Sequence, residues 1–409
     1  MEQNDETANL RRMQENIYAL TLVRLFGLFS MIGSGFIIRD IARKLYSRPG
    51  AFLQKVSLTQ SILIVLSIGD FFGAFFAQFI SSWMVPERSN LLGSVGSQRS
   101  CVAQGILSNF FYSLSGFSNA SLAVAYCLIV RYQWKDSDKN KNRWPFILVP
   151  IFIATVLAVV PLFGQNYNYN GGYSCYISGT PPGCEVDPNP QETCTRGAQA
   201  QNMLLFTSLI PILTCFFIIT VSVVLLIHAV LVQERRMDQY QRTGRSRKMT
   251  METFWQGMFY IGAFAISWIP WLLFGFRKYV EGQIYLVSYY AQQLLTPLHG
   301  VLNALVYFRP RLKAERERNP TDSRCKSLMQ VLHIKYCCNR KSKEGTGDAP
   351  IITNNQRAEK DAEMGTVKKV PTNPLAVDPE ITINPEAVHD AEIEPEKNVT
   401  TNSFAAEGE

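Results

Sequence analysis

The chain has 409 residues, a mean hydropathy of +0.01, a net charge of +7 and 18% charged residues. An average near zero suits a soluble protein, but it hides two unlike parts. Residues 1–307 hold 40 charged residues, about 13%, whereas residues 308–409 hold 33, about 32%. The first part is too apolar for a soluble domain and the second is too polar to form a core, which argues against a single soluble globular enzyme.

Long apolar runs fill the first part of the chain. A helix needs about 20 apolar residues to cross the roughly 30 Å of hydrocarbon in a bilayer. Runs of this kind lie at seven places, namely 17–38, 57–80, 101–130, 144–164, 201–232, 253–276 and 284–307. The runs are too long and too uniformly apolar for barrel strands. We therefore predict an all-α membrane protein, with a seven-transmembrane helix bundle over residues 17–307.

Lysine and arginine are distributed unevenly among the connections between these runs. Segments 39–56, 131–143 and 233–252 carry 5, 5 and 6 of them, whereas 81–100, 165–200 and 277–283 carry 2, 1 and 2. Cytoplasmic loops are the richer in basic residues. We therefore predict an extracellular N-terminus over residues 1–16, a cytoplasmic C-terminus and a multi-pass protein of the plasma membrane. Residues 1–16 lack the features of a signal peptide.

The polar tail divides into two segments of opposite charge. Residues 308–343 have a net charge of +8, and residues 344–409 have a net charge of −9. The first is predicted to be an amphipathic helix and basic juxtamembrane segment that contacts anionic membrane lipid. The second is predicted to be a disordered acidic cytoplasmic tail. The positive net charge is thus a sign of membrane topology, and we expect no nucleic-acid partner.

Four of the nine cysteines lie on the predicted outer side. Cys101 begins the third run, and Cys175, Cys184 and Cys194 lie in the long second outer loop. Three pairings into two disulfides are possible in an oxidising compartment. The sequence YSCYI favours pairing Cys175 with Cys101, and Cys184 with Cys194.

A second pair of cysteines lies in the basic juxtamembrane segment. Cys337 and Cys338, in the sequence HIKYCCNRK, suit acylation, and an unmodified reduced pair is the alternative.

Polar residues recur at helical spacing within three runs and predict a hydrated bundle interior. They are Ser67, Asp70 and Gln78 in the second run, Gln104, Ser108, Tyr112, Ser115 and Asn119 in the third, and Gln292, Thr296, His299, Asn303 and Tyr307 in the seventh. The alternative is hydrogen bonding that only holds the bundle together. Asp70 differs from the others, since a carboxylate in lipid needs a partner, a proton or a cation.

Two further features stand out inside the runs. Arg24 lies about 10 Å below the outer end of the first helix, where it either snorkels outward or meets an anionic ligand. Pro270, in the sequence SWIPW, is expected to kink the sixth helix beside Trp268 and Trp271. Pro211 and Pro297 predict further kinks, which favours a bundle that changes shape.

These motifs resemble those of the G-protein-coupled receptors, with rhodopsin-like features and others closer to the cyclic-AMP-receptor-like group. Asp70 in SIGDFFGAF matches the family's buried aspartate, which binds sodium in rhodopsin-like members. Trp268 and Pro270 in SWIP match the toggle tryptophan and kink proline. Asn303 and Tyr307 in LNALVY match the NPxxY switch, and Arg131 in VRY matches the cytoplasmic arginine.

The resemblance implies a receptor that converts binding of an extracellular ligand into activation of a heterotrimeric G protein, through movement of the sixth helix. The implied activation residues are Asp70, Arg131, Trp268, Pro270, Asn303 and Tyr307, with sodium possible at Asp70. Val130 stands in place of the usual acidic residue, and Ala304 in place of the proline of NPxxY. Depth and helical face predict an outer ligand pocket formed by Arg24, Gln104, Tyr112, Trp268, Trp271, Tyr289 and Gln293.

Other functions of seven-helix proteins fit less well. No lysine lies in the apolar runs for a retinal Schiff base, and His228 and His299 are too few for a zinc hydrolase. We therefore expect no enzyme, no cofactor and no resident metal other than the possible sodium. An ion or solute transporter that uses Asp70 and the polar residues is the main alternative.

Overall fold

The computed structural model describes residues 2–46, 57–87, 91, 93–132, 134, 143–182, 184–185, 193–240, 244–281, 286–320 and 322–332. The chain divides into Met1–Cys338 and Asn339–Glu409. The second unit lies outside the described residues, as do Cys337 and Cys338. The predicted juxtamembrane boundary near residue 343, the acidic tail and the acylation site therefore remain predictions.

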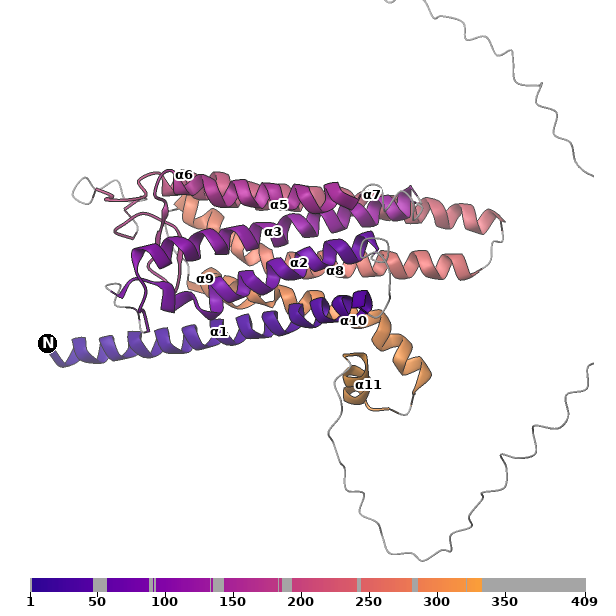
Figure 1. The fold of residues 1–409 in the computed structure, drawn as a ribbon, viewed down its shortest axis with the longest axis horizontal. Helices are drawn as coiled ribbons and strands as arrows, with labels where there is room; N and C mark the ends of the chain where they lie inside the picture. The colour runs from indigo at the N-terminus through magenta and orange to yellow at the C-terminus, as the bar shows by residue number, and fades with distance from the viewer. Residues whose placement is uncertain are drawn as a thin grey trace, which may run out of the picture. The chain divides into compact units, whose positions relative to one another are not determined.

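The described residues form a bundle of long helices that run side by side (Figure 1). The first three transmembrane helices are α1 (Glu2–Tyr46), α2 (Leu58–Ala74) and α3 (Gln98–Arg131), and α2 continues through the π turn η2 (Phe75–Phe79) into the 3₁₀ turn η3 (Ser81–Met84). The fourth is α5 (Arg143–Val159) with the 3₁₀ turn η5 (Val160–Leu162), and the fifth consists of α6 (Ala200–Leu204), the π turn η6 (Leu205–Leu209) and α7 (Ile210–Tyr240). The sixth is α8 (Gly244–Glu281), and the seventh consists of α9 (Leu286–Leu295), the 3₁₀ turn η7 (Thr296–Leu298) and α10 (His299–Arg318), after which α11 (Arg324–Val331) follows.

The predicted seven-helix bundle is confirmed, with differences at the helix ends. Six helices among the described residues are long and apolar enough to cross a membrane unbroken. The seventh is broken at Thr296–Leu298, because Pro297 has no N–H for an α-helical hydrogen bond. The first helix begins at Glu2, so residues predicted as a polar N-terminal segment are helical from Glu2 onward.

Prolines in the other helices have different local outcomes. The π turn η6 lies directly before Pro211, which cannot donate a backbone hydrogen bond to the preceding turn. Helix α8 continues through Pro270 without a break. In α10, the residues RPRLKAERER are helical, as predicted, but they continue the seventh helix rather than forming a separate one.

Helix α3 is the centre of the bundle and contacts α2, α5, α7 and α8. Helix α1 contacts α2 and α10. A short antiparallel hairpin, β1 (Tyr167–Tyr169) with β2 (Cys175–Ile177), packs against α3 and pairs Asn168 with Tyr176. The hairpin lies at the end of the bundle where α1 begins, and α11 packs on α10 at the other end (Figure 1).

Candidate functional site: a polar cluster and the aromatic residues beside it

A buried polar cluster joins the second, third and seventh transmembrane helices. Asp70 of α2 is 5% exposed and accepts hydrogen bonds at both carboxylate oxygens. The hydroxyl of Ser115 lies 2.5 Å and Nδ1 of His299 lies 2.8 Å from Oδ1, and Nδ2 of Asn303 lies 2.8 Å from Oδ2. Donors of this kind stabilise an ionised carboxylate that is removed from water. The polar residues predicted from helical spacing therefore do meet around Asp70.

The contacts of His299 assign the position of its proton. Nε2 of the ring faces Nδ2 of Asn119 at 2.9 Å and Nδ2 of Asn303 at 3.4 Å. An amide nitrogen only donates, so Nε2 accepts and Nδ1 carries the proton that is shared with Asp70. In this arrangement side chains of the third and seventh transmembrane helices surround the carboxylate of Asp70.

Two local features allow these side chains to meet. A Cβ on Gly69 would lie 2.9 Å from the backbone nitrogen of Ser115, so only glycine lets α2 approach α3 this closely. The 3₁₀ turn η7 ends just before His299, which begins α10. Within α10, His299 and Asn303 are four residues apart and therefore lie on one face of the helix, toward Asp70 of α2.

The cluster does not fit the sodium ion that the resemblance implied. A hard cation requires oxygen lone pairs turned toward it. Here the N–H of His299, the amide of Asn303 and the hydroxyl of Ser115 are turned toward the carboxylate of Asp70 instead.

Aromatic rings connect this cluster to the outer half of the bundle. The ring centroid of Trp268 lies 6.3 Å from that of His299 and 5.7 Å from that of Tyr112. Phe264 lies one turn before Trp268 in α8 and packs against both Trp268 and His299. Its ring centroid lies 5.9 Å from that of Trp268 and 6.0 Å from that of His299. Trp271 lies 6.2 Å from Trp268. Tyr112, Trp268 and Trp271 of the predicted pocket are therefore brought together.

Gln78 reaches this region, whereas Arg24 lies farther along the second helix. Arg24 donates to Oγ of Ser82 at 2.5 Å, and its guanidinium lies 4.9 Å from the ring centroid of Trp83. The side chain therefore lies against the outer end of the second helix. Nε2 of Gln78 donates to the hydroxyl of Tyr112. Gln293 is half-buried in α9, and the side chain of Tyr289 lies outside the described residues.

Gln104 has a different role from the predicted ligand contact. It is fully buried, and Nε2 donates to the carbonyl of Phe76 at 3.0 Å. Its Oε1 accepts the backbone N–H of Cys175 at 3.0 Å. Because both amide ends are engaged and the side chain is fully buried, Gln104 braces the outer loop against the second and third helices.

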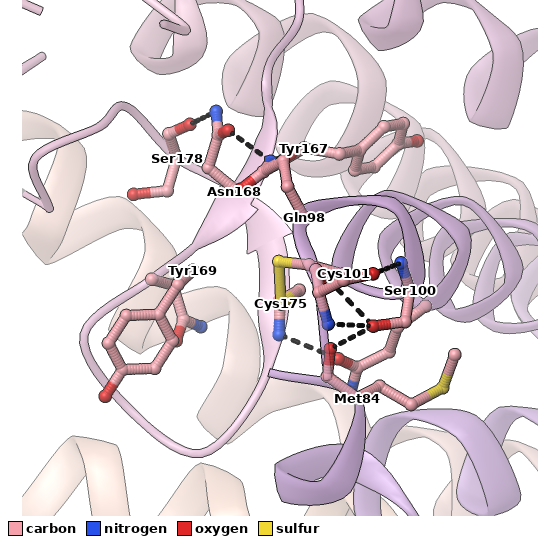
Figure 2. Close-up of a disulfide and its surroundings, with 12 residues drawn as sticks. Met84, Gln98, Ser100, Cys101, Tyr167, Asn168, Tyr169, Cys175 and Ser178 are labelled. Carbon is pink, nitrogen blue, oxygen red and sulfur yellow. Dashed lines mark hydrogen bonds between the residues drawn. A yellow bond between two sulfur atoms is a disulfide. The ribbon is translucent and has the colours of Figure 1, made fainter. Parts of the chain in front are cut away.

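Both predicted disulfides are confirmed. Cys101 is bonded to Cys175, which ties β2 to the start of α3, and Cys184 is bonded to Cys194 (Figure 2 shows the first). The hydroxyl of Ser100 donates to the carbonyl of Met84 at 2.9 Å, so the same helix start also holds the end of the second helix. The free cysteines Cys127 of α3 and Cys215 of α7 are buried.

The hairpin reaches into the bundle through Tyr176. The Tyr176 hydroxyl lies 3.2 Å from Oδ1 of Asn109 in α3 and 2.9 Å from Oγ of Ser208 in η6. Burial raises the pKa of Tyr176 to about 12, although the hydrogen bond with Ser208 lowers it. The loop is thus joined by hydrogen bonds to the third and fifth transmembrane helices.

At the opposite end of the bundle, Arg131 is the last residue of α3. Its side chain is exposed, and its guanidinium lies 5.6 Å from the ring centroid of Tyr132. Tyr126, five residues earlier, is buried and stacks on Tyr260 of α8 at 6.3 Å. Arg131 therefore lies where α3 extends beyond the buried part of the bundle, and its role as a switch residue stays a prediction.

Sequence reasoning missed a second buried carboxylate at this end. Asp40 of α1 is 7% exposed. It accepts hydrogen bonds from the hydroxyl of Tyr307 at 2.6 Å and from Nη1 of Arg311 at 2.6 Å, and Nζ of Lys44 lies 3.0 Å away. Asp40 lies two residues beyond the apolar run ending at 38, so a search within that run passed it over.

The geometry defines a class of protein: a seven-helix membrane protein with a buried polar cluster in its bundle, a disulfide-bonded hairpin at one end and a cluster of charged residues at the other. Among the described residues no group of three or more His, Cys, Asp and Glu side chains forms a metal site.

Comparisons with known proteins agree with this class. Residues 53–307 match the family described as "7 transmembrane receptor (rhodopsin family)". The crystal structure of squid rhodopsin is similar, with a TM-score of 0.55 and 13% sequence identity over 86% of this chain and 93% of that chain. The search of curated proteins gave no match. The chain belongs to the rhodopsin family of seven-transmembrane, G-protein-coupled receptors, and the narrower cyclic-AMP-receptor-like assignment is not confirmed.

Proposed function

We propose that this receptor binds a ligand at the outer end of its bundle and activates a heterotrimeric G protein by movement of α8. One observation carries the proposal. An unbroken series of ring contacts runs from Tyr112 through Trp268 to His299, which is bonded to Asp70. A ligand that displaces Tyr112 or Trp268 therefore acts directly on the buried cluster.

The ligand site proposed here is formed by Arg24, Tyr112, Trp268, Trp271, Tyr289 and Gln293. The aromatic rings supply contact area and Arg24 supplies a positive charge. Since Arg24 already donates to Ser82 and lies over Trp83, an anionic ligand group would share a guanidinium that is held in place. Gln104 is left out because it is fully buried and its amide already bonds to the carbonyl of Phe76 and to the backbone N–H of Cys175.

Neighbouring residues of α8 hold the sixth helix on two sides near the inner end. The guanidinium of Arg309 in α10 lies 4.1 Å from the ring centroid of Phe259. The next residue, Tyr260, stacks on Tyr126 of α3. An outward movement of α8 separates both pairs, so these contacts favour the resting state. They take the place of an ionic contact at Arg131, for which Val130 supplies no carboxylate.

Activation then follows from a shift of population between two arrangements of the bundle. A ligand that binds more tightly to the arrangement with α8 displaced increases the population of that arrangement. At saturation, the ratio of the two populations changes by the ratio of the ligand's affinities for the two arrangements. The switch residues in this proposal are Asp70, Trp268, Pro270, Asn303 and Tyr307. The displaced helix opens a basic inner surface to the G protein.

The orientation and location belong to the same proposal. The disulfide-bonded end faces the outside, where oxidising conditions allow disulfides, and the C-terminal end faces the cytoplasm. The plasma membrane is the proposed location. The tail, with Cys337 and Cys338, is proposed as a cytoplasmic regulatory segment.

The test is nucleotide exchange on purified G protein by the full-length receptor in lipid nanodiscs, screened against small molecules that include cyclic nucleotides. An active compound should lose its effect when Trp268 is replaced by leucine, while Trp144→Leu, an exposed tryptophan on α5, should leave it intact. Activity that is equally sensitive to both variants contradicts the proposed path through Trp268.

A transporter or channel remains the second candidate, because Asp70 is a buried carboxylate. Ion flux through the receptor reconstituted in vesicles without G protein, lost on Asp70→Asn, would support it. Agonist-stimulated nucleotide exchange without flux would exclude it.

A further inference from the structure

A group of four polar side chains joins α1 to α10 at the inner end of the bundle. Asp40 and Lys44 are four residues apart on α1, and Tyr307 and Arg311 are four residues apart on α10. Residues at this spacing lie on one face of a helix, so each helix presents two polar side chains to the other. The proposed function uses Tyr307 as a switch residue, and this group contains the side chains that hold it in place.

The hydroxyl of Tyr307 lies at the centre of the group. It donates to Oδ2 of Asp40 at 2.6 Å. It accepts hydrogen bonds from Nη2 of Arg311 at 3.1 Å and from Nζ of Lys44 at 3.3 Å. A hydrogen bond to an ionised carboxylate is stronger than one between neutral groups. The contact with Asp40 therefore fixes the hydroxyl of Tyr307 against α1.

The carboxylate of Asp40 does not depend on Tyr307 alone. Nη1 of Arg311 lies 2.6 Å from Oδ1, and Nζ of Lys44 lies 3.0 Å from Oδ2. If the hydroxyl of Tyr307 leaves, each carboxylate oxygen keeps a cation beside it, and no buried charge is left unpaired. The contact between Tyr307 and Asp40 can therefore break while α1 and α10 stay joined.

The ring of Tyr307 belongs to an apolar cluster that the sixth helix completes. This cluster also contains Tyr126 of α3 and Tyr260 of α8, and all three side chains are buried. Displacement of α8 separates Tyr260 from Tyr126 and opens space within the cluster. A Tyr307 side chain that is bonded to Asp40 cannot enter this space. The bond to Asp40 thus favours the arrangement in which α8 is not displaced.

We propose that Asp40 is a positioning residue of this receptor. It holds Tyr307 against α1 in the resting state, and Tyr307 leaves it when α8 is displaced. The inference rests on the proposed function for the part that α8 plays, whereas the contact between Tyr307 and Asp40 can be followed without a G protein.

The first experiment is fluorine-19 NMR of the full-length receptor in lipid nanodiscs, with 3-fluorotyrosine in place of Tyr307. Asp40→Asn should add a signal to the spectrum of the wild type, because a neutral amide holds the hydroxyl less tightly than a carboxylate does. Asp322→Asn is the matched control. It replaces a carboxylate that pairs with Lys326 outside this group, so the spectrum should stay unchanged. An Asp40→Asn spectrum identical to that of the wild type would overturn the proposal.

The second experiment measures basal nucleotide exchange on purified G protein. Asp40→Asn should raise the basal rate about tenfold, since it weakens a charge-assisted hydrogen bond that only the resting arrangement makes. In a Tyr307→Phe background the same change should alter the rate less than about twofold, because no hydroxyl remains for Asp40 to hold. Equal increases in both backgrounds would show that Asp40 acts independently of Tyr307, which contradicts the proposal.

If Asp40→Asn does not fold, 4-fluorophenylalanine in place of Tyr307 serves. It lacks the hydroxyl and leaves Asp40 paired with Arg311 and Lys44. Its ring should give more than one signal, and a single signal would overturn the proposal. A receptor without exchange activity whose spectrum responds to Asp40→Asn would contradict the proposed function and support the contact. Exchange activity with an unresponsive spectrum would do the reverse.

Discussion

Nδ1 of His299 lies 2.8 Å from Oδ1 of Asp70, and this contact joins the seventh transmembrane helix to the second. The contact sets the chemistry of the bundle centre, because the ring supplies a donor where sodium was expected from the resemblance. Ser115 and Asn303 complete the donors around the carboxylate. The centre of this receptor is therefore self-contained, and its response to salt distinguishes it from a sodium site.

His299→Ala tests that idea. Without the imidazole, Asp70 loses one donor and a space opens beside its carboxylate, so a sodium ion can enter. We expect the melting temperature of the wild type to be the same in sodium chloride and in choline chloride at equal ionic strength. We expect the melting temperature of the His299→Ala variant to be higher in sodium chloride than in choline chloride. A sodium-dependent wild type would contradict the donor arrangement described here.

Asp70→Asn should change signalling more than folding. The amide keeps one acceptor but turns its nitrogen toward a donor, which costs about 1–3 kcal/mol of stability if no partner rotates. The expected result is a small fall in melting temperature with a large change in agonist-stimulated nucleotide exchange. If the variant is unfolded or is retained inside the cell, with no selective effect on nucleotide exchange, Asp70 would be purely structural.

Arg309→Gln should raise basal activity. It removes the contact between the guanidinium and the Phe259 ring, and a cation–π contact at an exposed position contributes about 0.5–1 kcal/mol. Basal nucleotide exchange should therefore increase about two- to fivefold, provided the active arrangement is a minor population. Arg316→Gln, on the same helix and exposed, is the control that should leave the basal rate unchanged.

Asp40→Asn should destabilise the inner end of the bundle. The hydroxyl of Tyr307 and Nη1 of Arg311 both donate to this carboxylate, and an amide cannot accept at both positions. The loss should be about 1–3 kcal/mol, measured as a fall in the melting temperature of the purified receptor. Asp322→Asn removes the surface pair with Lys326 and should cost less than about 0.5 kcal/mol.

Tyr176→Phe tests the connection of the outer hairpin to the bundle at alkaline pH. Burial raises the pKa of Tyr176 from 10.0 to about 12, so the folded receptor holds this proton more tightly than the unfolded chain. The resulting stability is fully present below about pH 10 and is lost as the pH rises toward about 12. Between about pH 10 and about pH 12, the melting temperature of the wild type should fall by more than that of the variant. Identical losses would show that Tyr176 ionises as freely as an exposed tyrosine.

The sequence was sufficient for the bundle, for both disulfides and for the meeting of Asp70 with His299 and Asn303. Long apolar runs and helical spacing report directly on membrane crossing and on the buried face of each helix. They do not report on helix interruptions, which explains why the break of the seventh helix at Pro297 was expected only as a kink. They also do not report how deeply a residue near a helix end is buried, so they gave no sign that Arg131 would be exposed and Tyr126 buried against Tyr260.

The π turn at Phe75–Phe79 has a consequence for how the two ends of the second helix can vary. A π turn holds one residue more than an α turn and absorbs that residue locally, so the helix beyond it keeps the faces that it would have without the extra residue. Gln78 within the turn and Ser82 beyond it therefore reach Tyr112 and Arg24, while Asp70 on the other side keeps all of its partners. A single-residue deletion after the turn, where no π turn absorbs it, would instead rotate the residues beyond it by about 100° relative to the buried centre.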